Sequence, residues 1–307
     1  SEDEPSFVTM TSRIATQRTS SDGTTTKLAI ELQDGHLVES VIMRHNSRAT
    51  LCVSSQVGCA MGCTFCATGT MGIRGNLCSG EILEQLVHAS FVLNQDDEKG
   101  IRNIVFMGMG EPLNNYNNVV EACRVMMERK VWNLAHGHVT VSTVGVTPKM
   151  RQLTRELPQV NLALSLHAPN QKLRESIVPT ARTYPIEDMV QALDDHMQSS
   201  ASNNSHASNN KNNPNKPTSS QTTKTTKNNK RKKAMIEYVM LEGDTSTLQS
   251  AHELGKLCEN RHLVVNLIPY NKTNVKDVLS CPSEEQMMEF KRIVSSYGAF
   301  CTIRRTT

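Results

Sequence analysis

Short runs rich in β-branched residues alternate with helix-like segments along most of this 307-residue chain, and the alternation limits the folds open to it. Parallel strands joined by crossover helices give such a pattern, because each strand needs a long connection back to the same end of the sheet. About six strand–helix units are recognisable, fewer than the eight of a closed barrel. We therefore predict an α/β fold, an incomplete (β/α)6 barrel, with an open doubly wound sheet as the alternative. The strand-like runs cover residues 50–54, 101–107, 138–142, 160–166, 234–241, 262–268 and 299–303.

A small β element is expected ahead of this series. Residues 27–32 and 37–43 are strand-like and flank Asp34-Gly35, a dipeptide suited to a tight hairpin turn. We expect an N-terminal β-hairpin extension over residues 1–47 and a barrel domain over residues 48–307.

Residues 197–233 interrupt the barrel pattern. This segment consists almost wholly of Ser, Asn, Thr and Lys, and it lacks aromatic and branched aliphatic residues. So little apolar surface cannot offset the entropy lost on ordering, so we predict a disordered insertion. Eight Lys or Arg and no acid lie in it, so the rest of a chain with net charge +3 carries −5. Two interpretations of the insertion are open: a lengthened loop without function, or a basic arm that tethers RNA. We favour the first, because the entropy cost of closing a loop grows only slowly with its length.

The composition argues against two classes of protein. No apolar run is long enough to cross a bilayer, and the N-terminus lacks the basic and apolar layout of a secretory signal. The nine cysteines are odd in number and scattered, which favours metal binding in a reducing compartment over a disulfide scaffold. The first residue is Ser1 rather than Met, so we expect trimming from a longer protein. The expected location is the cytoplasm, or a plastid or mitochondrion if a transit segment has been removed.

Three cysteines lie within eight residues, at Cys59, Cys63 and Cys66, beside two glycines that let the backbone wrap closely around a ligand. A cubic iron–sulfur cluster takes four protein ligands, so three thiolates leave one iron open to bind another molecule. A zinc site would need a second ligand pair, for which only Cys78 is at hand. Three unrelated buried thiols are the other alternative. The loop directly follows the first barrel strand, where such folds place their catalytic loops.

This cysteine spacing, with an aromatic residue before the last Cys, resembles the signature of the radical S-adenosylmethionine (SAM) superfamily. Six further segments are similar to the RlmN/Cfr family of radical SAM RNA adenine methyltransferases. The resemblance runs from Glu39 to Arg305 and is interrupted by the insertion. The matching segments are residues 48–59, 107–114, 141–145, 164–170, 236–240 and 266–271.

The resemblance implies two cofactors, a 4Fe-4S cluster and SAM. The cluster ligands would be Cys59, Cys63 and Cys66. By residue type alone, a carboxylate after a glycine at a strand end suits an ammonium group, whereas a strand-end Ser or a lone His is usually structural. The SAM ligands that the resemblance implies are Gly110, Glu111, Ser142, Ser165, Leu166, His167 and Asn271.

The resemblance also implies a mechanism in which one SAM methylates a C-terminal cysteine and a second provides a radical that activates this methyl group. The carbon radical adds to adenine, a base removes the ring proton, and a second cysteine releases the product as a disulfide. Glu39 matches the proton acceptor and Cys52 the resolving cysteine. The Ala-Cys-Gly-Gln segment that carries the methyl group in the family would follow Thr307. Cys301 lies within a strand pattern and is no substitute, so we expect cofactor binding without complete turnover.

The implied reaction is methylation of adenine C2 in large-subunit rRNA, with tRNA as a further candidate substrate and C8 methylation as an alternative. The implied partners are RNA and an electron donor such as a flavodoxin or ferredoxin, with a monomeric enzyme and no membrane. Two rivals remain: a truncated relative that binds RNA or regulates without turnover, and a radical enzyme with another substrate.

Overall fold

The computed structural model describes residues 10–46, 48–95, 100–206, 234–272 and 279–304, with only the backbone of 200–206. Ten strands of this part form one sheet, and two more form a separate hairpin. In sheet order, the ten strands are β1 (Arg13–Thr19), β2 (Thr25–Glu31), β3 (Leu37–His45), β4 (Arg48–Cys52), β7 (Ile101–Phe106), β8 (Val139–Thr143), β9 (Asn161–Ser165), β10 (Ala234–Met240), β11 (Leu263–Pro269) and β12 (Phe300–Ile303). The hairpin pairs β5 (Gln56–Cys59) with β6 (Gly72–Asn76).

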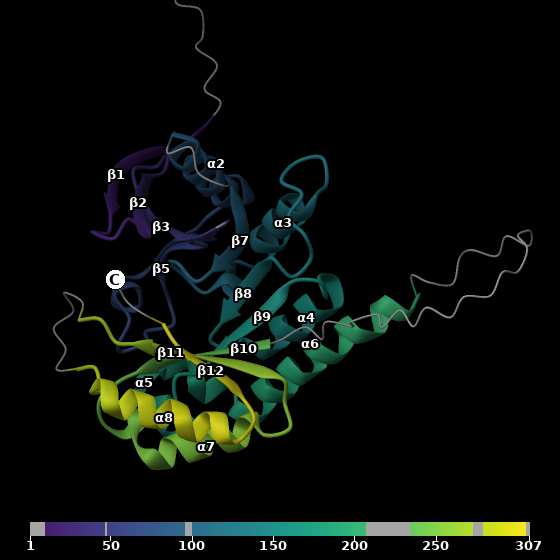
Figure 1. Ribbon diagram of the computed structural model, residues 1–307. Coiled ribbons are helices and arrows are strands. Elements are labelled where there is room, and N and C mark those ends of the chain that lie inside the picture. Colours follow the sequence, from purple (N-terminus) through teal and green to yellow (C-terminus); the bar gives the residue numbers. More distant parts are fainter. Residues whose placement is uncertain (1–9, 47, 96–99, 207–233, 273–278, 305–307) are drawn as a thin grey trace, which may run out of the picture.

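Seven neighbouring strands, β4 and β7 to β12, are parallel, and helices occupy the six connections between them. Figure 1 shows these helices along the outside of the curved sheet. No described strand joins the outer edges of β1 and β12, so the barrel is open. The predicted α/β fold is confirmed. The helices are α1 (Ala67–Thr70), α2 (Ser79–Gln95), α3 (Tyr116–Met127), α4 (Thr147–Glu156), α5 (Gln171–Ile177), α6 (Ile186–His206), α7 (Leu248–Cys258) and α8 (Glu284–Ser296), with 3-10 turns η1 (Pro112–Asn115), η2 (Pro179–Thr183) and η3 (Asp244–Ser246).

Local sequence features mark the starts of several helices. Helix α8 follows Ser283, whose side chain and that of Gln286 form a reciprocal capping box. Helix α4 carries Pro148 in its first turn, where a missing N–H costs nothing. Helix α2 buries Ile82, Leu86, Ala89 and Leu93 against the sheet, one stripe at helical spacing.

The N-terminal strands extend the same sheet. Strands β2 and β3 form the expected antiparallel hairpin, and β3 pairs with β4 so that Val41 stands opposite Cys52. Strand β1 was not predicted, because almost all of its side chains are exposed and no apolar alternation marks it. The carboxylate of Glu84 on α2 holds the start of β1 by accepting hydrogen bonds from Thr11 and Ser12. The domain boundary at residue 47 stays a prediction.

The predicted insertion begins within a helix. Helix α6 continues to His206, past the start of the segment 197–233. The rest of that segment, residues 207–233, lies outside the described residues. None of the described helices is long and apolar enough to cross a membrane.

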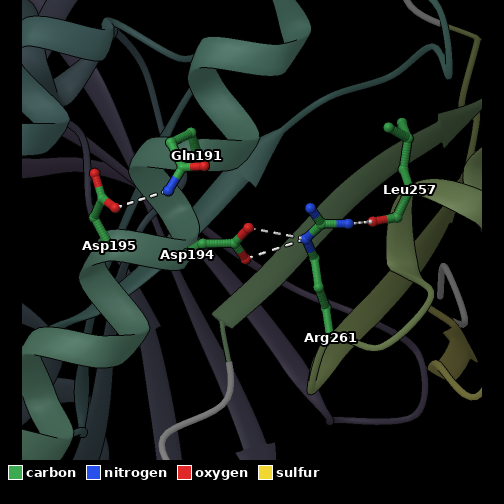
Figure 2. A network of polar contacts seen from close by, with 5 residues as sticks. All are labelled: Gln191, Asp194, Asp195, Leu257 and Arg261. Carbon is green, nitrogen blue, oxygen red and sulfur yellow. Dashed lines mark hydrogen bonds and ion pairs between the residues drawn. The ribbon is translucent and has the colours of Figure 1, made fainter.

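An ion pair between Asp194 on α6 and Arg261, which follows α7, joins these two helices (Figure 2). The guanidinium Nε of Arg261 donates to both carboxylate oxygens of Asp194 on α6, at 3.1 and 3.0 Å, and Nη1 donates to the carbonyl of Leu257 on α7 at 2.7 Å. The side chains of Arg261 and Asp194 are only 31% and 18% exposed. A shielded pair with three hydrogen bonds contributes more than an exposed one, because water screens it less.

We expect Arg261→Ala to lower the free energy of unfolding by about 1–2 kcal/mol, since it removes the ion pair and its hydrogen bonds and leaves Asp194 without its partner. Chemical denaturation followed by circular dichroism would measure the change. Arg292→Ala is the matched control, because Arg292 pairs with Glu289 on the exposed face of α8. That control should leave stability unchanged, and equal losses in both variants would contradict the assignment.

Candidate active site at the carboxyl ends of the parallel strands

The segments that follow β4 and β7 are joined by hydrogen bonds, and this places the cysteine loop. The N–H of Gly108 donates to the carbonyl of Val53 at 3.1 Å, and the N–H of Ser55 donates to Met109 at 2.9 Å. The side-chain carbonyl of Gln56 then accepts from the N–H of Glu111 at 2.8 Å. The chain leading to Cys59 therefore runs beside the Gly110-Glu111 segment.

Helix α2 holds the same segment from the other side. The buried amide of Gln85 accepts from the N–H of Ser54 at 2.8 Å and donates to its carbonyl at 2.9 Å. The Gln85 side chain thus makes the two backbone hydrogen bonds that a neighbouring strand would otherwise make with Ser54, just after β4 ends. Asn115 adds hydrogen bonds to the carbonyls of Ser55 and Leu77 at 2.8 and 2.7 Å.

The three cysteines of the sequence motif lie in one loop that crosses the mouth of the barrel. Cys59 ends β5 and is buried, Cys63 is buried in the loop, and Cys66 is half-buried just before α1. The N–H of Thr64 donates to the carbonyl of Ile177 on α5 at 3.0 Å. The Phe65 ring meets the His167 ring edge to face, with centroids 4.8 Å apart. The loop therefore reaches from β4 to the ends of β9 and β10.

The thiols repel one another once ionised. Burial first, and then the charges of the nearby Cys66 and Cys59 thiolates, raise the pKa of Cys63 to about 12. Burial also raises the pKa of Cys59. Three adjacent thiolates need a cation among them, and an all-sulfur donor set suits an iron–sulfur cluster. Within the described ranges, no three ligating side chains converge on a single metal ion. Cluster cysteines bind different irons, so such convergence is not required.

Glu111 brings a buried carboxylate to this loop. Its side chain is almost fully buried; Oε1 accepts from the N–H of Leu113 at 3.0 Å and Oε2 from the N–H of Val144 at 2.8 Å. Burial raises the pKa of Glu111, and these hydrogen bonds oppose the rise. Gly110, before it, has φ +100° and lies so close to Gln56 that an added Cβ would stand 2.6 Å from the Gln56 Cβ. An ammonium group arriving at Glu111 would find an oriented anion.

Further predicted SAM ligands gather at the ends of β8 and β9. The hydroxyls of Ser142 and Ser165 lie 3.0 Å apart, and the N–H of Leu166 donates to the carbonyl of Glu237. His167 has a left-handed backbone (φ +63°), and its Nδ1 accepts from the N–H of Val239 at 3.1 Å. Burial and then the charge of Arg174 lower the pKa of His167 to about 3, so the ring is neutral and donates through Nε2.

Asn271 is the exception among the predicted SAM ligands. It follows β11 and is exposed, so the structure does not bring it into the buried group.

Glu39 and Cys52 lie beside the site, at the first edge of the parallel strands. Cys52 ends β4, and burial raises its pKa to about 11, so the thiol is protonated at neutral pH. The charge of Glu39 contributes to this rise in the Cys52 pKa, whereas a hydrogen bond with the Met107 backbone and the charge of Arg304 oppose it. Glu39 is exposed and forms an ion pair with Lys27 of β2.

A polar row that the sequence reasoning missed crosses β10, β11 and β12. Asn266 donates to Oε1 of the buried Glu237 at 2.9 Å and accepts from the Thr302 hydroxyl at 2.6 Å. Arg304 lies 3.9 Å from Glu237 Oε1 and donates to the sulfur of Met107 at 3.5 Å. The signal was present: an acid within the otherwise apolar run at Ile236–Met240 is out of place in a buried strand.

Comparisons with known proteins agree with this geometry. Residues 53–206 match the model of the Radical SAM superfamily. A protein of Nitrosopumilus maritimus named "Ribosomal RNA large subunit methyltransferase N" is 36% identical over 292 residues, covering 93% of this chain and 74% of its own length. A "Probable dual-specificity RNA methyltransferase RlmN" of Dictyoglomus turgidum is 35% identical over 94% of this chain and 73% of its own length. This chain belongs to the RlmN family of radical SAM methyltransferases.

Solved structures agree with that membership. A radical SAM methyltransferase from Sphaerobacter thermophilus superposes with a TM-score of 0.83 at 34% identity, covering 96% of this chain and 77% of that one. SuiB of Streptococcus suis, in a structure bound to S-adenosylmethionine, shares the fold alone: its TM-score is 0.53 at 11% identity, over 84% of this chain and 51% of that one. Radical SAM membership implies a 4Fe-4S cluster and SAM as cofactors, and the all-thiol loop beside Glu111 fits both.

Gly58 should not tolerate a side chain. Its φ is +79°, and an added Cβ would stand 1.9 Å from the carbonyl oxygen of Gly72 across the hairpin that ends in Cys59. We expect Gly58→Ala to cost about 1–3 kcal/mol of stability from backbone strain alone, before the clash is counted. It should also lower the iron bound per chain after reconstitution.

Thermal unfolding and iron analysis would measure both effects. Gly75→Ala is the control from the same hairpin, because an added Cβ at Gly75 meets nothing within 4 Å. Normal stability and iron content in Gly58→Ala would show that the loop does not depend on this close contact.

Proposed function

We propose that this chain is a radical SAM enzyme that methylates C2 of adenine in large-subunit rRNA, with tRNA as a second substrate. The observation that carries the proposal is the three-thiol loop beside Glu111, in a chain 36% identical to a protein named as a large-subunit rRNA methyltransferase. Aromatic adenine carbon is a poor nucleophile, so polar methyl transfer would not suffice. The cofactors supply one-electron chemistry, which removes that obstacle.

In this proposal Cys59, Cys63 and Cys66 hold the cluster. Glu111 accepts hydrogen bonds from the ammonium group of SAM, and Gly110 leaves room for it to approach. The hydroxyls of Ser142 and Ser165, the backbone at Leu166, the Nε2–H of His167 and the amide of Asn271 serve the ribose or carboxylate. For Asn271 this requires its exposed side chain to turn toward the mouth when the cofactor binds.

Glu39 and Cys52 act on the substrate side. Glu39 takes the proton from adenine; its side chain is exposed and forms an ion pair with Lys27. Cys52 is a thiol at neutral pH and attacks as a thiolate, so it must lose its proton during the cycle. Arg304 favours that loss, because its positive charge opposes the effects of burial and Glu39 on the Cys52 pKa. The methyl-carrying cysteine is expected after β12, on the side of the mouth where Arg304 lies.

The proposal includes a monomeric enzyme that receives electrons from a flavodoxin or ferredoxin and works in the cytoplasm or an organelle. The mild negative charge outside residues 197–233 means that RNA must meet a local basic surface rather than a general positive field.

We expect Cys63→Ala to abolish cluster binding. The reconstituted wild-type protein should be brown, with a broad absorbance near roughly 400 nm from thiolate-to-iron charge transfer, and the variant should be colourless. Cys123→Ala is the control, because Cys123 is buried in α3 among apolar residues and should affect packing only. A colourless wild-type protein that holds stoichiometric zinc would overturn the cluster assignment.

The reaction is tested with the full-length protein, SAM, a reductant and an rRNA fragment, by mass spectrometry of the digested nucleosides. A protein that carries the expected methyl-bearing cysteine after Thr307 should form 2-methyladenosine over several turnovers, whereas residues 1–307 alone should bind the cofactors without completing turnover. Cys52→Ala should keep its colour, release no methylated RNA and accumulate a covalent protein–RNA adduct visible as a shifted band. Product found only as 8-methyladenosine would favour the alternative position. RNA binding without any methylated product would favour the RNA-binding rival.

A further inference from the structure

Arg174 is a buried cation at the back of the cysteine loop. It lies on α5 and is 1% exposed, the largest of the fully buried side chains in the described ranges. Its Nε donates to the carbonyl of Leu166 at 3.0 Å, and its Nη2 donates to the carbonyl of Val144. Nη1 is also buried and has no hydrogen-bond partner among the described residues. Two neutral carbonyls orient the guanidinium but do not neutralise it.

No carboxylate in the described part of the chain forms an ion pair with Arg174. The cysteine loop packs against the same helix: the N–H of Thr64 donates to the carbonyl of Ile177 on α5 at 3.0 Å, and Cys63 is buried in one cluster with Ile177 and Val178. His167, another neighbour of Arg174, is neutral. A buried charge without a counter-charge is strongly unfavourable, so an anion is expected beside the free Nη1.

The position of Arg174 also separates it from the carboxylate of Glu111. Val144 accepts from Arg174 through its carbonyl and donates to Glu111 through its N–H, so one residue orients both groups while they do not pair. Glu111 thus stays free for a cationic ligand, and Arg174 stays free for an anionic one.

We propose that Arg174 is the internal counter-charge of the iron–sulfur cluster, acting through Cys63 to stabilise its reduced form. This rests on the proposed function, in which Cys63 is a cluster ligand. Reduction adds one electron from a flavodoxin-type or ferredoxin-type donor and breaks no bond, so the cluster becomes more negative by one charge. A fixed cation in a low-dielectric surrounding favours that state and raises the reduction potential. In this proposal Arg174 is a positioning and electrostatic residue, since it acts through Cys63.

The test is a redox titration of the reconstituted full-length protein, without SAM and then with it, followed by electron paramagnetic resonance. Arg174→Gln removes the charge and should shift the midpoint potential to more negative values in both conditions. Arg174→Lys keeps the charge and should stay near the wild-type potential. Arg182→Gln, on the adjacent η2 segment, is the control: its side chain is 80% exposed, and its removal should change nothing. If Arg174→Gln does not fold, Arg174→Met replaces the cation by an apolar chain of similar reach.

Equal shifts in the Gln and Lys variants would overturn the proposal, because loss of the two carbonyl contacts would then account for both. A shift seen only with SAM bound would also overturn it and assign Arg174 to the carboxylate of SAM. A wild-type protein that takes up no cluster would instead refute the proposed function, before the variants are compared.

Discussion

The hydrogen bonds between the segments after β4 and β7 are the contact on which the site depends. Parallel strands end at the same edge of the sheet, but their loops normally diverge, and here they stay paired for several residues beyond the strands. Because of this, the cysteine loop that leaves β4 lies against the Gly110-Glu111 segment that leaves β7. Gly110 permits the approach, since any side chain there would collide with Gln56. The three thiols of the loop and the Glu111 carboxylate therefore come together through backbone geometry.

The charges of the site are buried and kept apart. Glu111 is an anion held by two N–H groups, Arg174 a cation held by two carbonyls, and the three thiols are costly to ionise together. Folding alone leaves these groups without partners of opposite charge in the described structure. Such an arrangement is unfavourable in isolation and becomes favourable when cationic and anionic ligands bind. A preorganised polar site of this kind gives up some stability for function.

Local, repeated sequence patterns made the fold predictable. The part of the site that depends on contacts between distant segments could not be predicted in the same way. Seven strand-like runs became seven parallel strands within two residues at each end, and three thiols in eight residues form a pattern typical of metal-binding loops. Strand β1 was missed because its side chains are largely exposed. An arginine on a short helix is usually exposed, and only the packing of α5 under the cysteine loop buries Arg174. Glu237 likewise depends on Asn266 and Thr302, which neighbouring strands bring from far along the chain.

The curvature of the sheet gives Cys52 neighbours from both of its halves. In strand order, five strands separate β4 from β12, yet the charge of Arg304 at the end of β12 acts on Cys52 at the end of β4. The hydrogen bond from Arg304 to the sulfur of Met107, which follows β7, likewise connects the two ends of the row of parallel strands. Glu39, which is paired with Lys27, acts on Cys52 from the antiparallel extension. An open barrel can therefore set a negative and a positive side chain on opposite sides of one thiol, which a flat sheet of the same strands could not do.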